Sequence, residues 1–346
     1  MDDPTQQLEV FNPNTDLPSD FLVIMYGLRR SGKTVMMKHM LYEMQDRLKN
    51  TEVYVICGTL EVNPGQYDFV PKSAQFSDIS NLEYRLKTII DRQKERKRKQ
   101  DEGEGGEIEK KKMYGSEDSD EEENGKTFHH ESKSRVAAKR EVVDPETYED
   151  TELKPVLIIL DDVVSENAVR TSPSLRLLAV GGRHLLISVI ILSQVVCGSA
   201  SVPPSVRTQA DCIIVVAQPR SRVERELLSE QYLCASNEAH AKTFGLQLLN
   251  KATEIEHQGL VISTISPSAR GYLDFCYTYG PVPFPPCPDD FKMGTEEQWL
   301  YEERMKGKKP SKKAKQLPDV FENKPDLPKH PKTGEYLRGL SNNIYW

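Results

Sequence analysis

The sequence predicts an α/β fold with a mostly parallel central sheet flanked by helices, and two observations lead to this class. First, apolar runs of five to seven residues recur along the chain. They are residues 21–26, 53–57, 156–160, 186–192, 212–217 and 260–265. Strands that are apolar on both faces belong inside a parallel sheet that helices cover. Second, helical patterns separate these runs, which is typical of α/β domains. They are residues 33–49, 80–92, 172–183 and 221–234.

Shifts in composition divide the chain into an N-terminal extension at 1–20, one domain at 21–280 and a C-terminal tail at 281–346 that is rich in proline and lysine. A charged block at about 92–150 interrupts the domain and has no apolar period from which to build a core. We expect a disordered insertion, because the apolar strands on its two sides complete one sheet. Its basic run at 92–99 is expected to be a solvated helix end, with nuclear import or DNA contact as the alternative.

Composition also excludes several classes of protein. The chain has 346 residues, and 46 Lys and Arg against 53 Asp and Glu give a formal net charge of −7, so any nucleic-acid site has to be local. The longest apolar stretch, 185–198, is interrupted by polar residues and is shorter than the roughly 20 residues that span a bilayer, so we expect no transmembrane segment. Residues 1–20 lack the pattern of a secretory signal. The six cysteines form no CxxC pair, which favours reduced thiols in an intracellular protein over disulfides or zinc.

Residues 27–34 fit the pattern G-x-x-x-x-G-K-[ST] and lie between the first apolar run and a helical pattern. The backbone N–H groups of such a loop, with the N-terminus of the next helix, can surround a phosphate chain. We expect Lys33 to reach the β- and γ-phosphates of ATP and the Thr34 hydroxyl to bind Mg²⁺. The predicted nucleotide-binding residues are Gly27, Leu28, Arg29, Arg30, Ser31, Gly32, Lys33 and Thr34.

The apolar run at 156–160 ends in two acidic residues, Asp161 and Asp162. A P-loop NTPase needs a carboxylate for the magnesium shell, and we assign Asp161 to it. Asp162 lies at the C-terminal edge of the strand, where ligands of open α/β sheets bind, so we expect it to orient or deprotonate the attacking water. The alternative is that Asp162 only caps the next loop.

The next apolar run is followed by Gln194, whose amide is expected beside the γ-phosphate, where it would report hydrolysis to the rest of the subunit. The alternative is an ordinary polar residue at a strand end. Further along, Arg207 follows a Pro-Pro turn. It is the candidate for an arginine that one subunit offers to the active site of its neighbour, where the arginine neutralises charge on the transferring phosphoryl group. Arg183 and Arg220 are alternatives for that role, and surface solvation is the simpler explanation for each.

In this order the residues resemble the genome-packaging ATPases of large double-stranded DNA viruses, the poxvirus-type branch of the FtsK/HerA superfamily. The resemblance covers about 21–91 and 151–265. The phosphate loop is shared by all P-loop NTPases, and the later motifs narrow the family. These motifs are Leu160-Asp161-Asp162, Gly182-Arg183-His184 before an Ile/Val-rich strand, Gln194 at its end, and the Pro-Pro-x-x-Arg turn that ends in Arg207.

The resemblance implies a RecA-like P-loop core that uses ATP and Mg²⁺ to pump double-stranded DNA into a preformed capsid. It also implies a homo-oligomeric ring of five or six copies, with capsid or portal-vertex proteins as further partners. The expected location is the host-cell cytoplasm or nucleus at viral assembly sites, or the virion. By position, Lys33, Thr34, Asp161, Asp162 and Gln194 take the family's roles, and Arg207 takes that of the trans-acting arginine.

Two other functions stay open from the sequence. A RecA-fold helicase or recombination ATPase would prefer single-stranded DNA and unwind it. A nucleotide-binding assembly switch would bind ATP with little turnover. The two carboxylates with Gln194 favour hydrolysis, since a binding module has little need for the second carboxylate.

Overall fold

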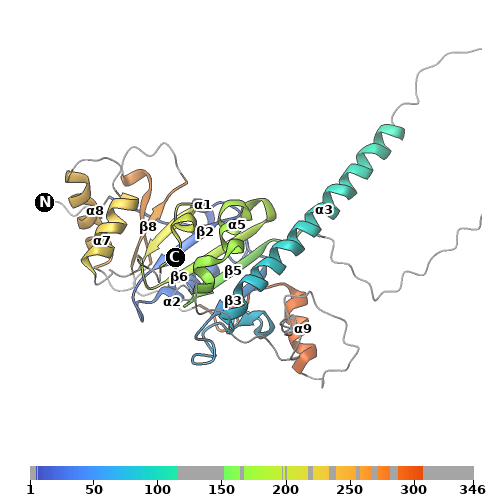
Figure 1. The fold of residues 1–346 in the computed structure, drawn as a ribbon, viewed down its shortest axis with the longest axis horizontal. Coiled ribbons are helices and arrows are strands. Elements are labelled where there is room, and N and C mark those ends of the chain that lie inside the picture. The colour runs from blue at the N-terminus through green and yellow to red at the C-terminus, as the bar shows by residue number, and fades with distance from the viewer. Residues whose placement is uncertain are drawn as a thin grey trace, which may run out of the picture. The chain divides into compact units, whose positions relative to one another are not determined.

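The structure is a computed structural model that describes residues 5, 7–114, 152–163, 167–196, 198, 201–216, 221–233, 239–254, 258–265, 272–280 and 287–306, without the side chains of 103–114, 167–168, 239–242 and 304–306. The chain divides into two compact units, of which one comprises Met1–Asp91 and Lys154–Trp346 and the other Arg92–Leu153. The first unit holds the sheet (Figure 1).

The described residues form a nine-stranded sheet with the order β1-β9-β8-β7-β2-β6-β5-β3-β4. Every pairing is parallel except those of β8, which runs antiparallel to β7 and β9. The strands are β1 (Glu9–Val10), β2 (Leu22–Tyr26), β3 (Glu52–Cys57), β4 (Gln75–Phe76), β5 (Val156–Asp161), β6 (Ile187–Ser193), β7 (Cys212–Val215), β8 (Gly259–Ser263) and β9 (Cys276–Tyr279).

The six predicted apolar runs all form strands, and the predicted mostly parallel α/β class is confirmed. Every residue of β2, β3, β5, β6 and β7 is buried, as expected for strands covered on both faces. The run that forms β8 is equally apolar although its strand is antiparallel. Its sequence reflects burial under helical cover, which does not depend on strand direction.

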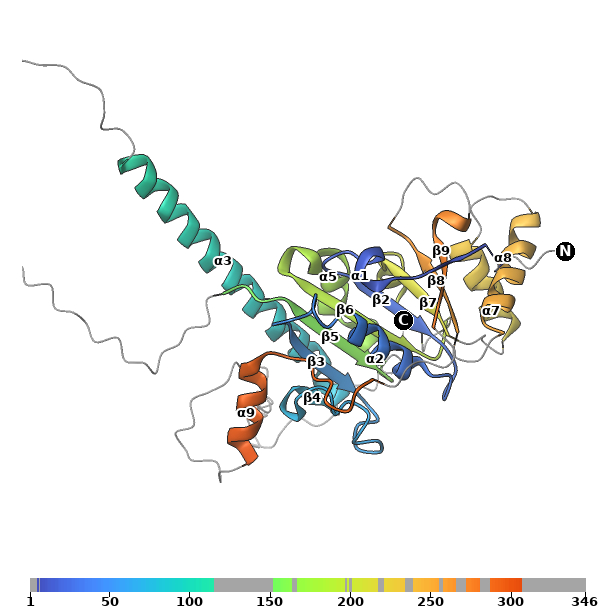
Figure 2. The same cartoon turned by 180° about the vertical axis from the view of Figure 1, so that it is seen from behind.

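Helices cover both faces of the sheet because the chain crosses it in opposite directions. The β2-α2-β3 crossover leads one way along the sheet and β5-α5-β6 leads back, so right-handed connections place α2 and α5 on opposite faces (Figures 1 and 2). The helices are α1 (Pro13–Asp16), α2 (Lys33–Glu43), α3 (Leu82–Tyr114), α4 (Asn167–Thr171), α5 (Pro173–Gly181), α6 (Pro204–Arg207), α7 (Arg222–Leu228), α8 (Ala239–Ala252) and α9 (Glu296–Lys306). Short helical turns are η1 (Lys72–Ala74), η2 (Ile79–Asn81), η3 (Gly182–Leu185), η4 (Ser229–Leu233) and η5 (Tyr272–Asp274).

The charged insertion begins as a helix, so the expectation of disorder is wrong for its first part. Helix α3 continues through the basic run as far as Tyr114. Its Lys, Arg, Glu and Gln residues have high helix propensity. Ion pairs one turn apart add to this, since Arg98 contacts Glu95 and Glu102 at 2.7 Å. The basic run therefore lies inside a helix and does not end it, contrary to the expectation, and residues 115–150 lie outside the described part of the chain.

Both flanking segments contribute to the unit that holds the sheet, so it extends beyond the predicted boundaries at 20 and 280. Strand β1 pairs with β9, and Phe11 and Leu17 are buried in the core. In α9, the buried Gln298 side chain accepts a hydrogen bond from Val53 N (3.1 Å) and donates one to Val53 O (3.0 Å). Among the described helices, none combines the length and apolar character needed to cross a bilayer.

Candidate nucleotide-binding site

The phosphate loop lies between β2 and α2, as predicted, and two glycines shape it. Gly32 precedes α2 with a φ of 89°, a left-handed conformation that glycine adopts without strain. A Cβ at Gly27 would lie 2.6 Å from Ser31 Oγ, so the Ser31 side chain would have to move to admit one. The Gly27 N–H donates to the Ser193 carbonyl (3.2 Å), which fixes the start of the loop to the end of β6.

Lys33 is held inside this loop. Its Nζ donates to the Gly27 carbonyl (2.7 Å) and the Leu28 carbonyl (3.0 Å), and the side chain is buried. Burial lowers the pKa of the Lys33 amine, and the nearby Asp161 and Asp162 carboxylates oppose that shift. The amine therefore lies close to the two acidic residues that the sequence placed at the end of another strand.

Asp161 and Thr34 are joined by a third residue, Gln66. The Gln66 Nε2 atom donates to Asp161 Oδ2 (2.9 Å) and to Thr34 Oγ1 (3.1 Å), and the Tyr67 hydroxyl donates to the same Asp161 oxygen (2.7 Å). Burial raises the pKa of Asp161, and the hydrogen bond from Tyr67 acts against this. Burial and the Asp161 charge raise the pKa of Tyr67 well above its usual value, so Tyr67 remains a donor.

Asp162 and Gln194 are in direct contact, because Gln194 Nε2 donates to Asp162 Oδ1. The contact follows from strand order. Strand β6 lies between β2 and β5, so its C-terminal end reaches the space between the phosphate loop and the two carboxylates. Thr59, which follows β3, approaches the other Asp162 oxygen (3.5 Å). Asp162 thus contacts a polar residue on either side.

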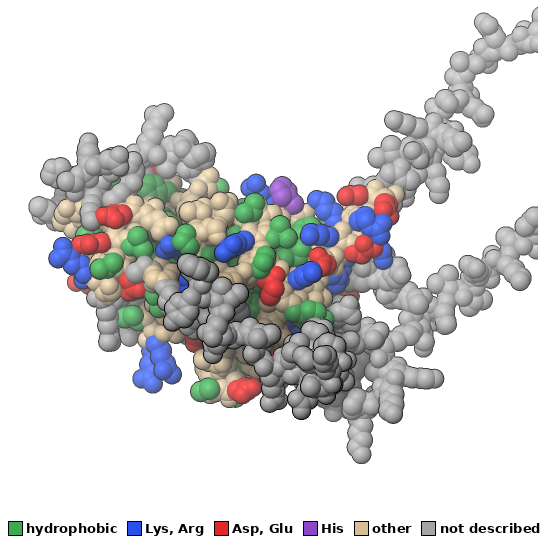
Figure 3. Space-filling model, in the orientation of Figure 1, with side chains coloured by type: hydrophobic (Ala, Val, Ile, Leu, Met, Phe, Trp, Pro, Cys, Tyr) green, Lys and Arg blue, Asp and Glu red, His purple; other side chains and the backbone are tan. Residues whose placement is uncertain are grey.

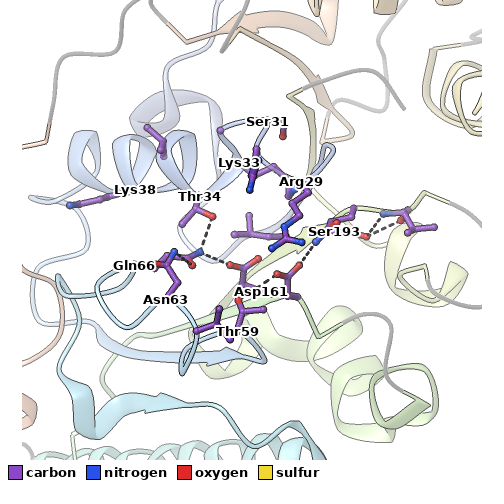
Figure 4. A pocket seen from close by; sticks show the side chains of 18 residues that line it. Arg29, Ser31, Lys33, Thr34, Lys38, Thr59, Asn63, Gln66, Asp161 and Ser193 are labelled. Carbon is purple, nitrogen blue, oxygen red and sulfur yellow. Dashed lines mark hydrogen bonds between the residues drawn. The ribbon is translucent and has the colours of Figure 1, made fainter. Parts of the chain in front are cut away.

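These residues surround one pocket of about 970 Å³, and Figure 4 shows Arg29 and Lys33 facing Asp161 across it. Six of the eight predicted loop residues line the pocket, together with Asp161, Asp162 and Gln194. The loop residues that line it are Arg29, Arg30, Ser31, Gly32, Lys33 and Thr34. The phosphate loop after β2, with β6 between it and β5, gives the RecA-like P-loop arrangement predicted from the sequence.

Arg207 does not line the pocket of its own chain, which an arginine offered to a neighbour need not do, and its burial gives no support to that predicted role. It ends α6 with its side chain buried, and its Nη1 donates to the Val196 carbonyl (2.7 Å). Its charge acts on the buried phenols of Tyr26 and Tyr232, whose pKa values are raised by burial. The apolar turn that precedes Arg207 packs into the core and carries the arginine inward. Of the two alternatives, Arg183 is exposed and Arg220 lies outside the described residues.

Sequence reasoning missed the polar residues that follow β3. Thr59, Asn63, Gln66 and Tyr67 belong to one loop at the sheet edge where β2, β5 and β6 also end, and the first three line the pocket. The C-terminal ends of parallel strands meet at a shared edge. That rule, applied to the run at 53–57, would have drawn attention to them.

The side-chain oxygen atoms of the pocket suit the binding of Mg²⁺ and a nucleotide. Thr34 Oγ1 and Asp161 Oδ2 both lie within hydrogen-bonding distance of one nitrogen, Gln66 Nε2, so a hydroxyl and a carboxylate converge on a small space. Mg²⁺ prefers such oxygen ligands and keeps several waters. The Ser31 hydroxyl is buried and has no hydrogen-bond partner among the described residues.

No family model and no curated sequence matches the chain. Several solved structures are similar in fold. The genome-packaging NTPase B204 of Sulfolobus turreted icosahedral virus 2, in complex with ATP-gammaS, is 14% identical over 71% of this chain and 93% of its own, with a TM-score of 0.38. The pCW3 conjugation coupling protein TcpA is 13% identical over 75% and 60%, with a TM-score of 0.44. The Type VII secretion ATPase EccC of Thermomonospora curvata is 13% identical over 72% and 25%, with a TM-score of 0.37. They include a viral packaging NTPase, the class that the motifs resemble, but similarity at this level assigns no activity to this chain.

Proposed function

We propose that this protein is a Mg²⁺-dependent ATPase that translocates double-stranded DNA and packages a viral genome into a capsid. One observation carries the enzymatic part, namely the contact between Asp162 and Gln194 in the pocket that also holds Lys33, Thr34 and Asp161. A pocket that only binds nucleotide needs no second carboxylate oriented by an amide. The packaging role is supported by the sequence motifs.

The residues divide the chemistry between them. Thr34 and Asp161 would hold Mg²⁺, which when bound neutralises charge on the phosphates, and Lys33 would turn from its own loop carbonyls to the β- and γ-phosphates. Asp162 would accept a proton from the attacking water as the water oxygen bonds to the γ-phosphorus and the bond to the ADP oxygen breaks. Gln194 holds the Asp162 carboxylate by its amide and would sense the change of charge there.

A trans-acting arginine, where the ring supplies one, would be Arg183. It lies in η3 at the N-terminal end of β6, whereas the pocket lies at the C-terminal end of that strand. Arg183 therefore cannot reach the pocket of its own chain, but it is exposed and available to a neighbouring copy.

DNA binding requires a local basic surface, because the whole chain carries a net charge of −7. The face shown in Figure 3 carries several Lys and Arg side chains between hydrophobic ones. Helices α4 and α5 and the η3 turn contribute exposed basic side chains, which are Arg170, Arg176, Arg183 and His184. A ring of five or six copies would present such surfaces to the duplex. Capsid or portal-vertex proteins as partners, and viral assembly sites in the cytoplasm or nucleus as location, belong to the same proposal.

The test is steady-state ATP hydrolysis without DNA, with single-stranded DNA and with linear duplex, each at two salt concentrations. We expect stimulation chiefly by duplex and a steep loss of that stimulation at high salt, because phosphate contacts release counterions. Lys33→Ala should abolish turnover, and Lys49→Ala, a change at an exposed lysine, should leave it unchanged. Stimulation by single strands would instead favour a helicase, and nucleotide binding without turnover would favour an assembly switch.

A further inference from the structure

Gln66 connects the two proposed metal ligands to the segment that follows it along the chain. Its Nε2 contacts Thr34 Oγ1 and Asp161 Oδ2, and its Oε1 accepts a hydrogen bond from Asn63 Nδ2 (3.1 Å). The carboxylate fixes which end of the amide faces Asp161, because an amide oxygen there would bring two acceptors together. The hydrogens of Gln66 therefore point into the space between the two ligands.

Those hydrogens compete with a metal ion. A cation binds the lone pairs of Thr34 and Asp161, and the positive end of the Gln66 amide cannot occupy the same space. Gln66 therefore has to withdraw when Mg²⁺ arrives with a nucleotide, or turn its amide so that Oε1 accepts hydrogen bonds from metal-bound water. Either movement breaks side-chain hydrogen bonds that hold Gln66 in place, which are those to Thr34, Asp161 and Asn63.

The loop continues into contacts with the C-terminal part of the described chain. Residues 66–72 form what we term the 66–72 segment. Its Phe69 carbonyl accepts a hydrogen bond from Met293 N (2.7 Å), and the Phe69 ring stacks on Phe291 with centroids 5.6 Å apart. Lys72 N donates to Glu302 Oε2 in α9 (2.7 Å). One short segment thus contacts the metal ligands at its start and residues 291–302 at its end.

We propose that Gln66 is a positioning residue that couples metal and nucleotide occupancy to the contacts of the 66–72 segment with residues 291–302. The inference rests on the proposed nucleotide site and adds a route by which occupancy changes a surface remote from the phosphates. In this proposal, the contacts of α9 change when nucleotide and metal occupy the pocket.

Hydrogen exchange of the wild-type chain tests the route in three states: without nucleotide, with ATPγS and EDTA, and with ATPγS and Mg²⁺. We expect the exchange of residues 66–72 and 291–302 to change only in the third state. Nucleotide binding is measured separately with a fluorescent analogue. Binding without any Mg²⁺-dependent change in these residues would overturn the inference alone. Absence of binding would overturn the proposed function, and the inference with it.

Gln66→Leu keeps the bulk of the side chain and removes its donors. Because the amide no longer competes for the ligands, the Mg²⁺ concentration for half-maximal nucleotide binding should fall about fivefold. The exchange response of residues 291–302 should fall by at least half. Gln45→Leu, a change at an exposed glutamine of the same chain, is the matched control and should alter neither quantity. Thermal unfolding verifies that the variant is folded, and an unchanged Mg²⁺ requirement or exchange response in the folded variant would contradict the proposal.

Discussion

Asp162, the proposed catalytic base, has an unfavourable backbone conformation. Its φ is 52°, in the left-handed region, where residues other than glycine are uncommon and Asp and Asn are tolerated best. The turn directs its carboxylate away from the buried line of β5 and toward Gln194 and Thr59. Strained conformations of this kind cluster at functional sites, which agrees with the role proposed for Asp162.

The division of roles between Lys33 and Asp162 gives a first prediction. Asp162→Asn keeps a residue that tolerates the left-handed turn, so ATP binding should stay largely intact while turnover falls about 100-fold or more. Lys33→Ala should lose nucleotide binding itself, since we expect the Lys33 amine to contact the β- and γ-phosphates. Equilibrium binding and steady-state hydrolysis, measured on both variants, separate the two effects. Equal loss of binding in both variants would contradict the assignment.

Asp161 gives a second prediction, on stability. Because burial raises its pKa, the folded state holds the Asp161 proton more tightly than the unfolded state does. The ionised carboxylate therefore costs stability above its folded pKa, and this cost disappears as the pH falls below the unfolded value of about 4. Asp161→Asn removes the charge, so without nucleotide the variant should be more stable than wild type at pH 7, by on the order of 1 kcal/mol.

Urea unfolding at pH 7 and at successively lower pH measures this difference. The advantage of Asp161→Asn should shrink as the pH approaches 4, and the variant should lose Mg²⁺-dependent nucleotide binding. A variant that is less stable than wild type at pH 7 would show that the hydrogen bonds from Tyr67 and Gln66 outweigh the burial of the charge.

Two arginines give a third prediction. Arg207→Ala should destabilise the subunit, because it leaves the Val196 carbonyl without its partner at a buried site, and activity in mixed assemblies should fall in proportion to the mutant fraction. Arg183→Ala should leave stability nearly unchanged and reduce activity more than proportionally, since one copy would impair its neighbour. Titration of each variant into wild type distinguishes the two. A disproportionate loss with Arg207→Ala would restore the role predicted from the sequence.

At the scale of elements, α9 is attached to the sheet by a side chain. The Gln298 amide contacts both backbone groups of Val53 in β3, as a neighbouring strand would. Helix formation needs only local propensity, but this attachment needs a glutamine to meet one backbone position 245 residues away. The sequence pattern therefore placed α9 in the C-terminal tail and did not predict its contact with the sheet.

This attachment gives a fourth prediction. Gln298→Ala leaves the N–H and C=O of Val53 without these partners in a buried place, so the free energy of unfolding should fall by about 2 kcal/mol. Gln45→Ala, at an exposed position, should change it little. Urea unfolding of the full chain measures both. A loss below about 0.5 kcal/mol for Gln298→Ala would mean that water replaces the amide at this position.

At the scale of the whole molecule, the order of strands decides which motifs meet. Strand β6 enters the sheet between β2 and β5, so the ends of three strands far apart in sequence face one pocket. The approximate positions of these strands could be predicted from their apolar runs, and so could the polar residues that end them. The contact between Gln194 and Asp162, 32 residues apart, requires the sheet.

The sequence by itself determined the α/β class, the phosphate loop at residues 27–34 and the acidic pair after β5, because each depends on residues that are neighbours along the chain. The burial of Arg207, the link from Gln66 to Asp161 across 95 residues and the packing of α9 on β3 were decided only by the tertiary structure. In each case one side chain meets a partner that local pattern does not specify. Periodicity reports which face of an element is buried, and the fold alone decides what that face meets.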